Sequence, residues 1–375
     1  DSFWCCVGTG MENHAKYGDS IYFHHGNTLW VNLFIASELT WKEPQVVVRQ
    51  ETRFPEDATT RLVFACTQPR ELAVRIRWPH WAVSGFQVRV NGKEQPVSGK
   101  PSSFVELRRT WAHGDVVEVH MPMSLRTEGF RDNPRKLAVF YGPVLLCTPV
   151  EVGRPFPVMV GQPADIPKAI EPAGKPLEFR AKGPVFRSVE TQGPVELHLV
   201  PFYKEYRRPY LVYWDLLDET QWKARCEAHR AEVAREKALQ ARTVDRVIIG
   251  SDPSEQQHRL QGHRHASGLF GGRHWRHAID GWFSYELALP AGKPAELLVT
   301  YWGSDTGARV FDVLVDGVKI ATQKLDRNKP DQFFDQIYPL PAELTRGKEK
   351  ITVRFEAHRG NIAGGVFDLR VLRKP

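Results

Sequence analysis

The chain has 375 residues, of which 42% are hydrophobic and 25% charged, so it is long enough to form two or three globular domains. Its 29 glycines and 27 prolines predict a turn-rich, mainly β chain. The net charge of +7 comes from scattered Lys and Arg, which argues against nucleic-acid binding. The sequence contains no stretch of 18 apolar residues, so no membrane-spanning helix is predicted.

Two cysteines stand side by side at Cys5 and Cys6. Adjacent cysteines rarely form a disulfide with each other, because the bond needs a larger separation of the Cα atoms. Three alternatives stay open: buried structural thiols, partners in separate disulfides, or ligands of one metal ion. Thiolates suit Zn²⁺, and coordination keeps a thiol deprotonated and nucleophilic. The remaining cysteines are expected to be buried packing residues: Cys66, Cys147 and Cys226.

The N-terminal part of the chain changes from helical to strand character. Residues 7–18 predict a short helix with Thr9 as its N-cap and Glu12 at capping-box spacing. Residues 19–150 contain short strands of alternating polarity between turns, including a tight turn at Asn91–Gly92. This pattern predicts a β-sandwich over 19–150.

The central region, residues 151–279, is mixed. The Pro- and Gly-rich stretch 151–176 predicts a surface linker, and short strands follow it. Residues 218–244 predict one long helix, because they are rich in Ala, Glu, Lys and Arg. The segment 245–279 holds five histidines, and a metal site is one interpretation. Its H-x-H spacing at 263–265 has no carboxylate pattern beside it, so a long ordered loop docked on a neighbouring domain is favoured.

Residues 280–375 predict a second sandwich, with the jelly-roll strand order of carbohydrate modules. Trp78 and Trp81 in the first sandwich either line a sugar cleft or pack the end of the sandwich. Four aromatic residues in or near the second sandwich carry the same two alternatives: Trp275, Trp282, Tyr301 and Trp302. Asp305 and Asp312 either bind calcium or are solvated loop carboxylates.

Six segments resemble, in chain order, the second half of the β-L-arabinofuranosidase glycoside hydrolases of families 127 and 146: SFWCCVGTGMENHAKYGDSIYF, LWVNLFIASELTW, RIRWPHWA, AVFYGPVLL, VPFYKEYRRPYLVYW and GRHWRHAIDGWFSYEL. The resemblance implies an (α/α)6 barrel followed by β-sandwich domains, and a retaining mechanism in which a Zn²⁺-bound cysteine is the nucleophile. By that resemblance Cys5 matches the nucleophile and Cys6 the neighbouring zinc ligand. Residues 1–18 would then be the end of the helical barrel.

The family's Glu-x-Cys ligand pair and its acid/base glutamate have no counterpart in this chain, and we expect them upstream of Asp1. The resulting fold expectation is mainly β, with sandwich domains after a barrel remnant, one long helix and a jelly-roll-like C-terminal sandwich. The main functional hypothesis is a fragment of a retaining zinc-dependent glycosidase, inactive alone, that belongs to an enzyme for β-L-arabinofuranosides of plant glycans.

The alternative hypothesis is a non-catalytic β-sandwich module for carbohydrate binding or dimerisation. In either case the expected partner is a plant polysaccharide or oligosaccharide that contains arabinofuranose, with a homodimer as a further arrangement. The resemblance implies a bacterial parent protein that is periplasmic or secreted.

Overall fold

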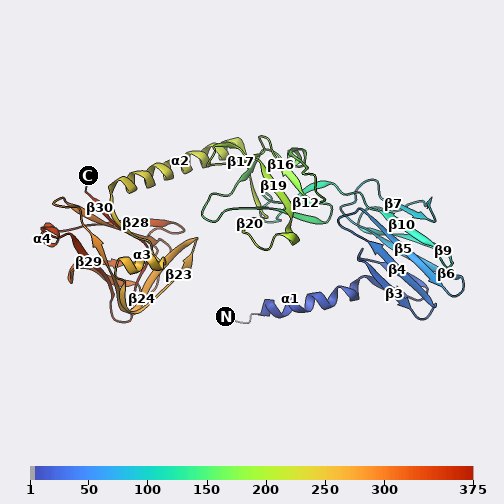
Figure 1. The fold of residues 1–375 in the computed structure, drawn as a ribbon, viewed down its shortest axis with the longest axis horizontal. Helices are drawn as coiled ribbons and strands as arrows, with labels where there is room; N and C mark the ends of the chain where they lie inside the picture. Colours follow the sequence, from blue (N-terminus) through green and yellow to red (C-terminus); the bar gives the residue numbers. More distant parts are fainter. Residues whose placement is uncertain (1–4, 375) are drawn as a thin grey trace. The chain divides into compact units, whose positions relative to one another are not determined.

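A computed structural model of the protein describes residues 5–374 (Figure 1). Their contacts form two compact units, of which unit 1 ends at Glu227 and unit 2 begins at Ala228. The division falls within the long helix α2 (Glu219–Arg242). No helix in this described part is long and apolar enough to cross a membrane.

Unit 1 opens with helix α1 (Cys5–Lys16), followed by the short η1 (Gly18–Ser20). The side chains described in α1 are solvent-exposed, including Met11 at 67%. Thr9 lies inside α1 rather than at its N-cap, so the capping expectation was wrong: the helix extends back at least to Cys5.

Two packed sheets form the first sandwich of unit 1. The four-stranded sheet has the order β1 (Tyr22–His25), β2 (Thr28–Val31), β6 (Arg70–Trp78), β9 (Ser103–Trp111). The six-stranded sheet has the order β3 (Ser37–Trp41), β4 (Val46–Thr52), β5 (Thr59–Cys66), β10 (Val116–His120), β7 (Gln87–Val90), β8 (Lys93–Glu94).

Alternating side chains explain the core of this sandwich. In β5 every second residue, such as Leu62 and Phe64, is fully buried, as expected for strands with one face on a core. Trp111 of β9 stacks on Phe64 at a ring-centroid distance of 4.3 Å and so joins the two sheets. The predicted turn at Asn91–Gly92 is confirmed: both residues have positive φ, and they connect β7 to β8.

A third sheet completes unit 1 around a separate core. Its main order is β15 (Ile170–Pro172), β16 (Phe179–Ala181), β19 (Leu197–Pro201), β13 (Val144–Pro149), β12 (Lys136–Tyr141), β21 (Trp214–Leu217), β14 (Val158–Val160), β17 (Phe186–Ser188), β18 (Gly193–Pro194). β11 (Leu125–Gly129) pairs with β12, and β20 (Tyr210–Leu211) pairs with β13. Three short 3-10 helices lie between these strands: η2 (Pro163–Asp165), η3 (Pro167–Ala169) and η4 (Phe202–Lys204).

The third sheet changes two sequence expectations. Strands β11–β13 were assigned to the first sandwich, but they pair with the third sheet. The stretch 151–176 was expected to be a surface linker, yet β14 within it is fully buried and pairs in parallel with β21. Three buried residues between prolines and glycines are too few to show a strand period.

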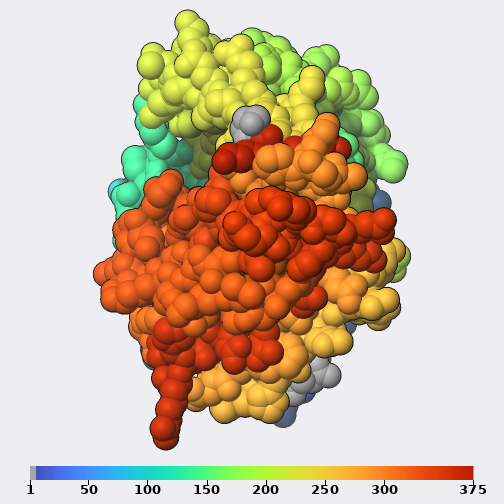
Figure 2. All heavy atoms as spheres, turned by 90° about the vertical axis from the view of Figure 1, so that its left-hand side faces the viewer, coloured from blue at the N-terminus to red at the C-terminus, as the bar shows by residue number. Residues whose placement is uncertain are grey.

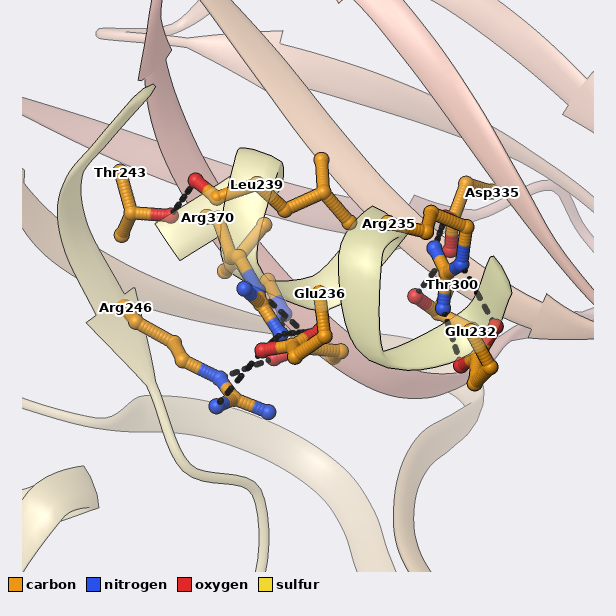
Figure 3. Close-up of polar contacts among 11 residues, drawn as sticks. Glu232, Arg235, Glu236, Leu239, Thr243, Arg246, Thr300, Asp335 and Arg370 are labelled. Carbon is orange, nitrogen blue, oxygen red and sulfur yellow. Dashed lines mark hydrogen bonds and ion pairs between the residues drawn. The ribbon is translucent and has the colours of Figure 1, made fainter. Parts of the chain in front are cut away.

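The two halves of helix α2, which was expected over 218–244, have different surroundings. Its first turns bury Trp222 and Cys226 against valines of unit 1, which confirms Cys226 as a packing residue. The second half, within unit 2, contains no buried residue. It contacts the sheet of unit 2 through ion pairs, and Figure 3 shows Arg370 and Arg246 reaching Glu236 from that sheet.

Unit 2 is a nine-stranded antiparallel sheet curled around one core. Figure 2 shows the surface of its C-terminal part in orange and red. Its order is β27 (Val318–Lys324), β26 (Val310–Val315), β29 (Lys350–Ala357), β24 (Arg273–Ala288), β30 (Ile362–Arg373), β25 (Ala295–Trp302), β28 (Phe333–Pro339), with β22 (Thr243–Val247) on β30 and β23 (Gln261–Phe270) on β24. Two short helices complete it: α3 (Asp252–Gln257) and α4 (Ala342–Thr345). Tyr338 of β28 donates a hydrogen bond of 2.7 Å to Gln323 of β27, so the two end strands meet and the sheet is nearly closed.

The histidine-rich segment 245–279 was expected to be a long loop, and this expectation was wrong. It contains α3 and most of the β23–β24 hairpin. Both faces of β23 are largely solvent-exposed. The strand therefore lacks the apolar alternation from which strands are recognised.

Candidate functional site

One face of the unit 2 sheet points away from its core. β30 lies between β24 and β25, where Val366 pairs with Arg276 and with Tyr301. Val366 and Tyr301 are fully buried in the core. Because neighbouring residues of a strand point to opposite faces, Trp275 and Trp302 project from the outer face.

Aromatic rings follow one another across this outer face. Phe270, at the tip of the β23–β24 hairpin, lies 5.1 Å from Trp302 between ring centroids. Trp302 lies 4.9 Å from Phe333, and Phe333 lies 4.8 Å from Phe367. Phe270 is 48% exposed, so the row of rings is open to solvent at this end.

A pocket of about 390 Å³ opens among these rings, and we call it the outer-face pocket. Phe270, Trp275 and Trp302 line it together with Asp305 and Gly365. A Cβ atom on Gly365 would lie 3.6 Å from the Cβ of Trp275 and 4.0 Å from Oδ2 of Asp305. Glycine at this position therefore leaves the floor of the pocket open.

A carboxylate and a guanidinium supply the charges of the pocket. Arg309 Nη2 lies 3.7 Å from Asp305 Oδ1, and both side chains are 18% exposed. Arg309 Nη1 also donates a 2.8 Å hydrogen bond to the carbonyl of Gly364. Burial raises the pKa of Asp305, and the charge of Arg309 opposes this only in part.

The imidazole of His277 also lines the pocket. Burial, and next the positive charge of Arg309, lower its pKa below 6.5. Both effects disfavour the protonated imidazole. Besides this imidazole, the acidic and basic side chains that line the pocket are Asp305 and Arg309.

The two tryptophans of the first sandwich that were predicted to contact substrate differ in their contacts. Trp78 stacks on Phe86 at 4.9 Å and donates a 2.7 Å hydrogen bond to the carbonyl of Ala82, which are packing contacts. Trp81 is 6% exposed, stacks on Phe54 at 6.0 Å and lines a different pocket of about 390 Å³. A substrate contact by either residue stays a prediction.

The predicted zinc residues are at the start of α1. Cys6 is exposed there, and the side chain of Cys5 lies outside the described residues. Within residues 5–374, no three His, Cys, Asp or Glu side chains come close enough to hold a metal ion. The described residues therefore do not form a zinc site by themselves.

The absence of a metal-binding cluster among the described residues also applies to the histidine-rich segment and to Asp312, which lies in β26 and not in a loop. His258 forms a 3.0 Å hydrogen bond with Asp245, and His265 accepts one of 2.7 Å from Arg276. Asp312 bonds to Thr322 and lies 3.0 Å from His358. These side chains are engaged in structural contacts.

Two family matches cover most of the chain. Residues 28–123 match the family described as β-L-arabinofuranosidase, GH127 middle domain. Residues 238–372 match a family of unknown function, DUF6805. No curated protein matches the chain.

Solved structures similar to parts of the chain include two glycoside hydrolases. One, described only as a glycoside hydrolase, is 21% identical over 57% of this chain and 40% of its own, with a TM-score of 0.47. A GH127 β-L-arabinofuranosidase from Geobacillus stearothermophilus T6 is 20% identical over 57% of this chain and 37% of its own, with a TM-score of 0.42. The matched part thus spans about two fifths of these enzymes.

A family 35 carbohydrate binding module from Clostridium thermocellum also matches. It is 12% identical over 34% of this chain and 98% of its own, with a TM-score of 0.27.

Proposed function

We propose that unit 2 binds carbohydrate as a non-catalytic module of an enzyme related to the GH127 β-L-arabinofuranosidases. The match of residues 28–123 to the middle-domain family of these enzymes supports the proposal. Unit 2 holds the ligand in the outer-face pocket. The sugar belongs to a plant glycan that contains arabinofuranose.

This proposal rests on the solvent-accessible aromatic rings around a pocket that also contains one carboxylate and one guanidinium. Sugar rings present apolar C–H faces and polar hydroxyl edges. Trp275 and Trp302 offer flat apolar surfaces to the first, and Asp305 and Arg309 offer an acceptor and donors to the second. Pockets for small ligands combine mostly apolar walls with a few polar groups in this way.

Affinity gel electrophoresis of the full chain in gels that contain arabinan tests the proposal. We expect arabinan to retard the wild type, and Trp302→Ala or Trp275→Ala to remove the retardation. Trp282→Ala is the matched control, because Trp282 lies on β24 but contacts Arg354 instead of lining the pocket. If the pocket variants are retarded like the wild type, the proposal fails.

A second proposal keeps the catalytic hypothesis, and the family match of residues 28–123 favours it. In it Cys6 is a zinc ligand, and Cys5 is both a zinc ligand and the nucleophile of a retaining glycosidase. These roles stay predictions for the full enzyme, because the described residues lack the other ligands. Zinc content and release of 4-nitrophenol from an arabinofuranoside test it, with Cys6→Ala compared against Cys66→Ala, a buried thiol of β5.

A further inference from the structure

The charge balance of the outer-face pocket limits which sugars it can take. Asp305 and Arg309 lie 3.7 Å apart in a partly buried setting, where each charge is offset by the other. A carboxylated sugar bound to Arg309 would also face the carboxylate of Asp305 across the same small space. Like charges at such range repel strongly when they are shielded from water.

Two other polar side chains of the pocket, Ser304 and Thr306, are already engaged. Ser304 donates a hydrogen bond of 3.0 Å to Asp331, and Thr306 donates one of 3.3 Å to Asp326. Recognition of hydroxyl groups therefore falls to Asp305 and Arg309, with the imidazole of His277 beside them. Asp305 has acceptor sites beyond its contact with Arg309, and a guanidinium has five N–H donors. Together they match a sugar hydroxyl, which donates and accepts at once.

We infer that the outer-face pocket selects uncharged sugars over uronic acids, and that Asp305 is the residue that excludes the acids. This inference rests on the proposed function. Trp275 and Trp302 supply affinity for any sugar ring, whereas Asp305 accepts from neutral hydroxyls and repels a carboxylate. Gly365 keeps the floor open, so that the ring can reach this pair.

Calorimetric titration of the full chain with arabinotriose and with trigalacturonic acid, at physiological salt, tests the inference. We expect the wild type to bind arabinotriose and to bind trigalacturonic acid at least tenfold more weakly. Asp305→Asn should weaken arabinotriose binding by about tenfold, since a charged acceptor is lost. The same change should strengthen trigalacturonic acid binding, because Arg309 then has no competing carboxylate.

Asp312→Asn is the matched control. It changes the net charge of unit 2 equally, and Asp312 lies outside the pocket lining. A wild type that binds both trisaccharides equally, or an Asp305→Asn variant with the wild-type preference, overturns the inference and leaves the proposed function standing. A wild type that binds neither overturns both. Thermal melting of each variant verifies that it folds.

Discussion

A buried ion pair in unit 2 gives the sharpest stability prediction. Glu255 of α3 forms hydrogen bonds of 2.9 and 2.8 Å with Arg276 of β24, and it accepts a third of 2.7 Å from Tyr285. The side chains of Arg276 and Glu255 are 7% and 4% exposed. Glu255→Gln keeps the shape but removes the charge that compensates Arg276.

The size of the effect follows from this burial. Removing one partner of a buried pair leaves an uncompensated charge and costs about 3–5 kcal/mol. We therefore expect Glu255→Gln to lower the free energy of unfolding of unit 2 by about that amount. Replacing both residues, as Glu255→Leu with Arg276→Met, should cost less than Glu255→Gln alone, because no charge then stays buried.

Hydrogen exchange of the full chain in increasing urea measures the effect in β24 and β30. The control is Glu286→Gln, which breaks an ion pair with Arg259. The two side chains lie 3.1 Å apart, but that of Arg259 is 69% exposed. We expect less than about 1 kcal/mol there. Equal losses for Glu255→Gln and Glu286→Gln, or a double variant less stable than Glu255→Gln, would refute the argument from burial.

Three further predictions concern pH, salt and the pocket. Burial, and next the positive charge of Arg276, lower the pKa of His265 in the folded chain. As the pH falls through 6.5, the unfolded chain therefore takes up a proton that the folded chain does not, and unit 2 should lose stability in thermal melts below that pH. His265→Gln should reduce this loss. The second half of α2 is held by ion pairs such as Glu236–Arg370, so its hydrogen exchange should quicken between 0.05 and 1 M NaCl, whereas exchange in β30 should stay constant. Gly365→Ala should weaken arabinan retardation without lowering the melting temperature, because the added Cβ meets only ordinary contacts; a drop in melting temperature would contradict this.

Local patterns explain how much of the fold could be predicted. Strands with one buried face, such as β5, show the period of two, and the Asn91–Gly92 turn has the residues that a positive φ requires. Cys66 and Cys147 were expected to be buried in strands, and both are. β14 was missed because it is three residues long, and β23 because its exposed faces are both polar.

The candidate site was less accessible to sequence reasoning. Trp275 and Trp302 were recognised as sugar-binding candidates by residue type alone. Arg309 and Gly365 were missed, because no local signal connects a loop arginine with a glycine 56 positions later. They meet only in the folded sheet, where Arg309 donates a hydrogen bond to the carbonyl of Gly364, a contact between residues distant in the sequence. Phe270 was missed with the hairpin that carries it.

The outer face of the unit 2 sheet changes along β30 from charged to aromatic side chains. Where α2 covers it, the face is charged: Arg370 is held by Asp368 from its own strand and by Glu236 from the helix, at 2.7 and 2.8 Å (Figure 3). Further along the same strand, Phe367 and Gly365 border the outer-face pocket, whose lining among the residues described contains no helix residue. Open aromatic surface on a folded domain favours association or ligand binding. The neutral Asp305–Arg309 pair at its edge favours a ligand with hydroxyl groups over a second apolar protein surface, because a protein partner would have to desolvate both charges.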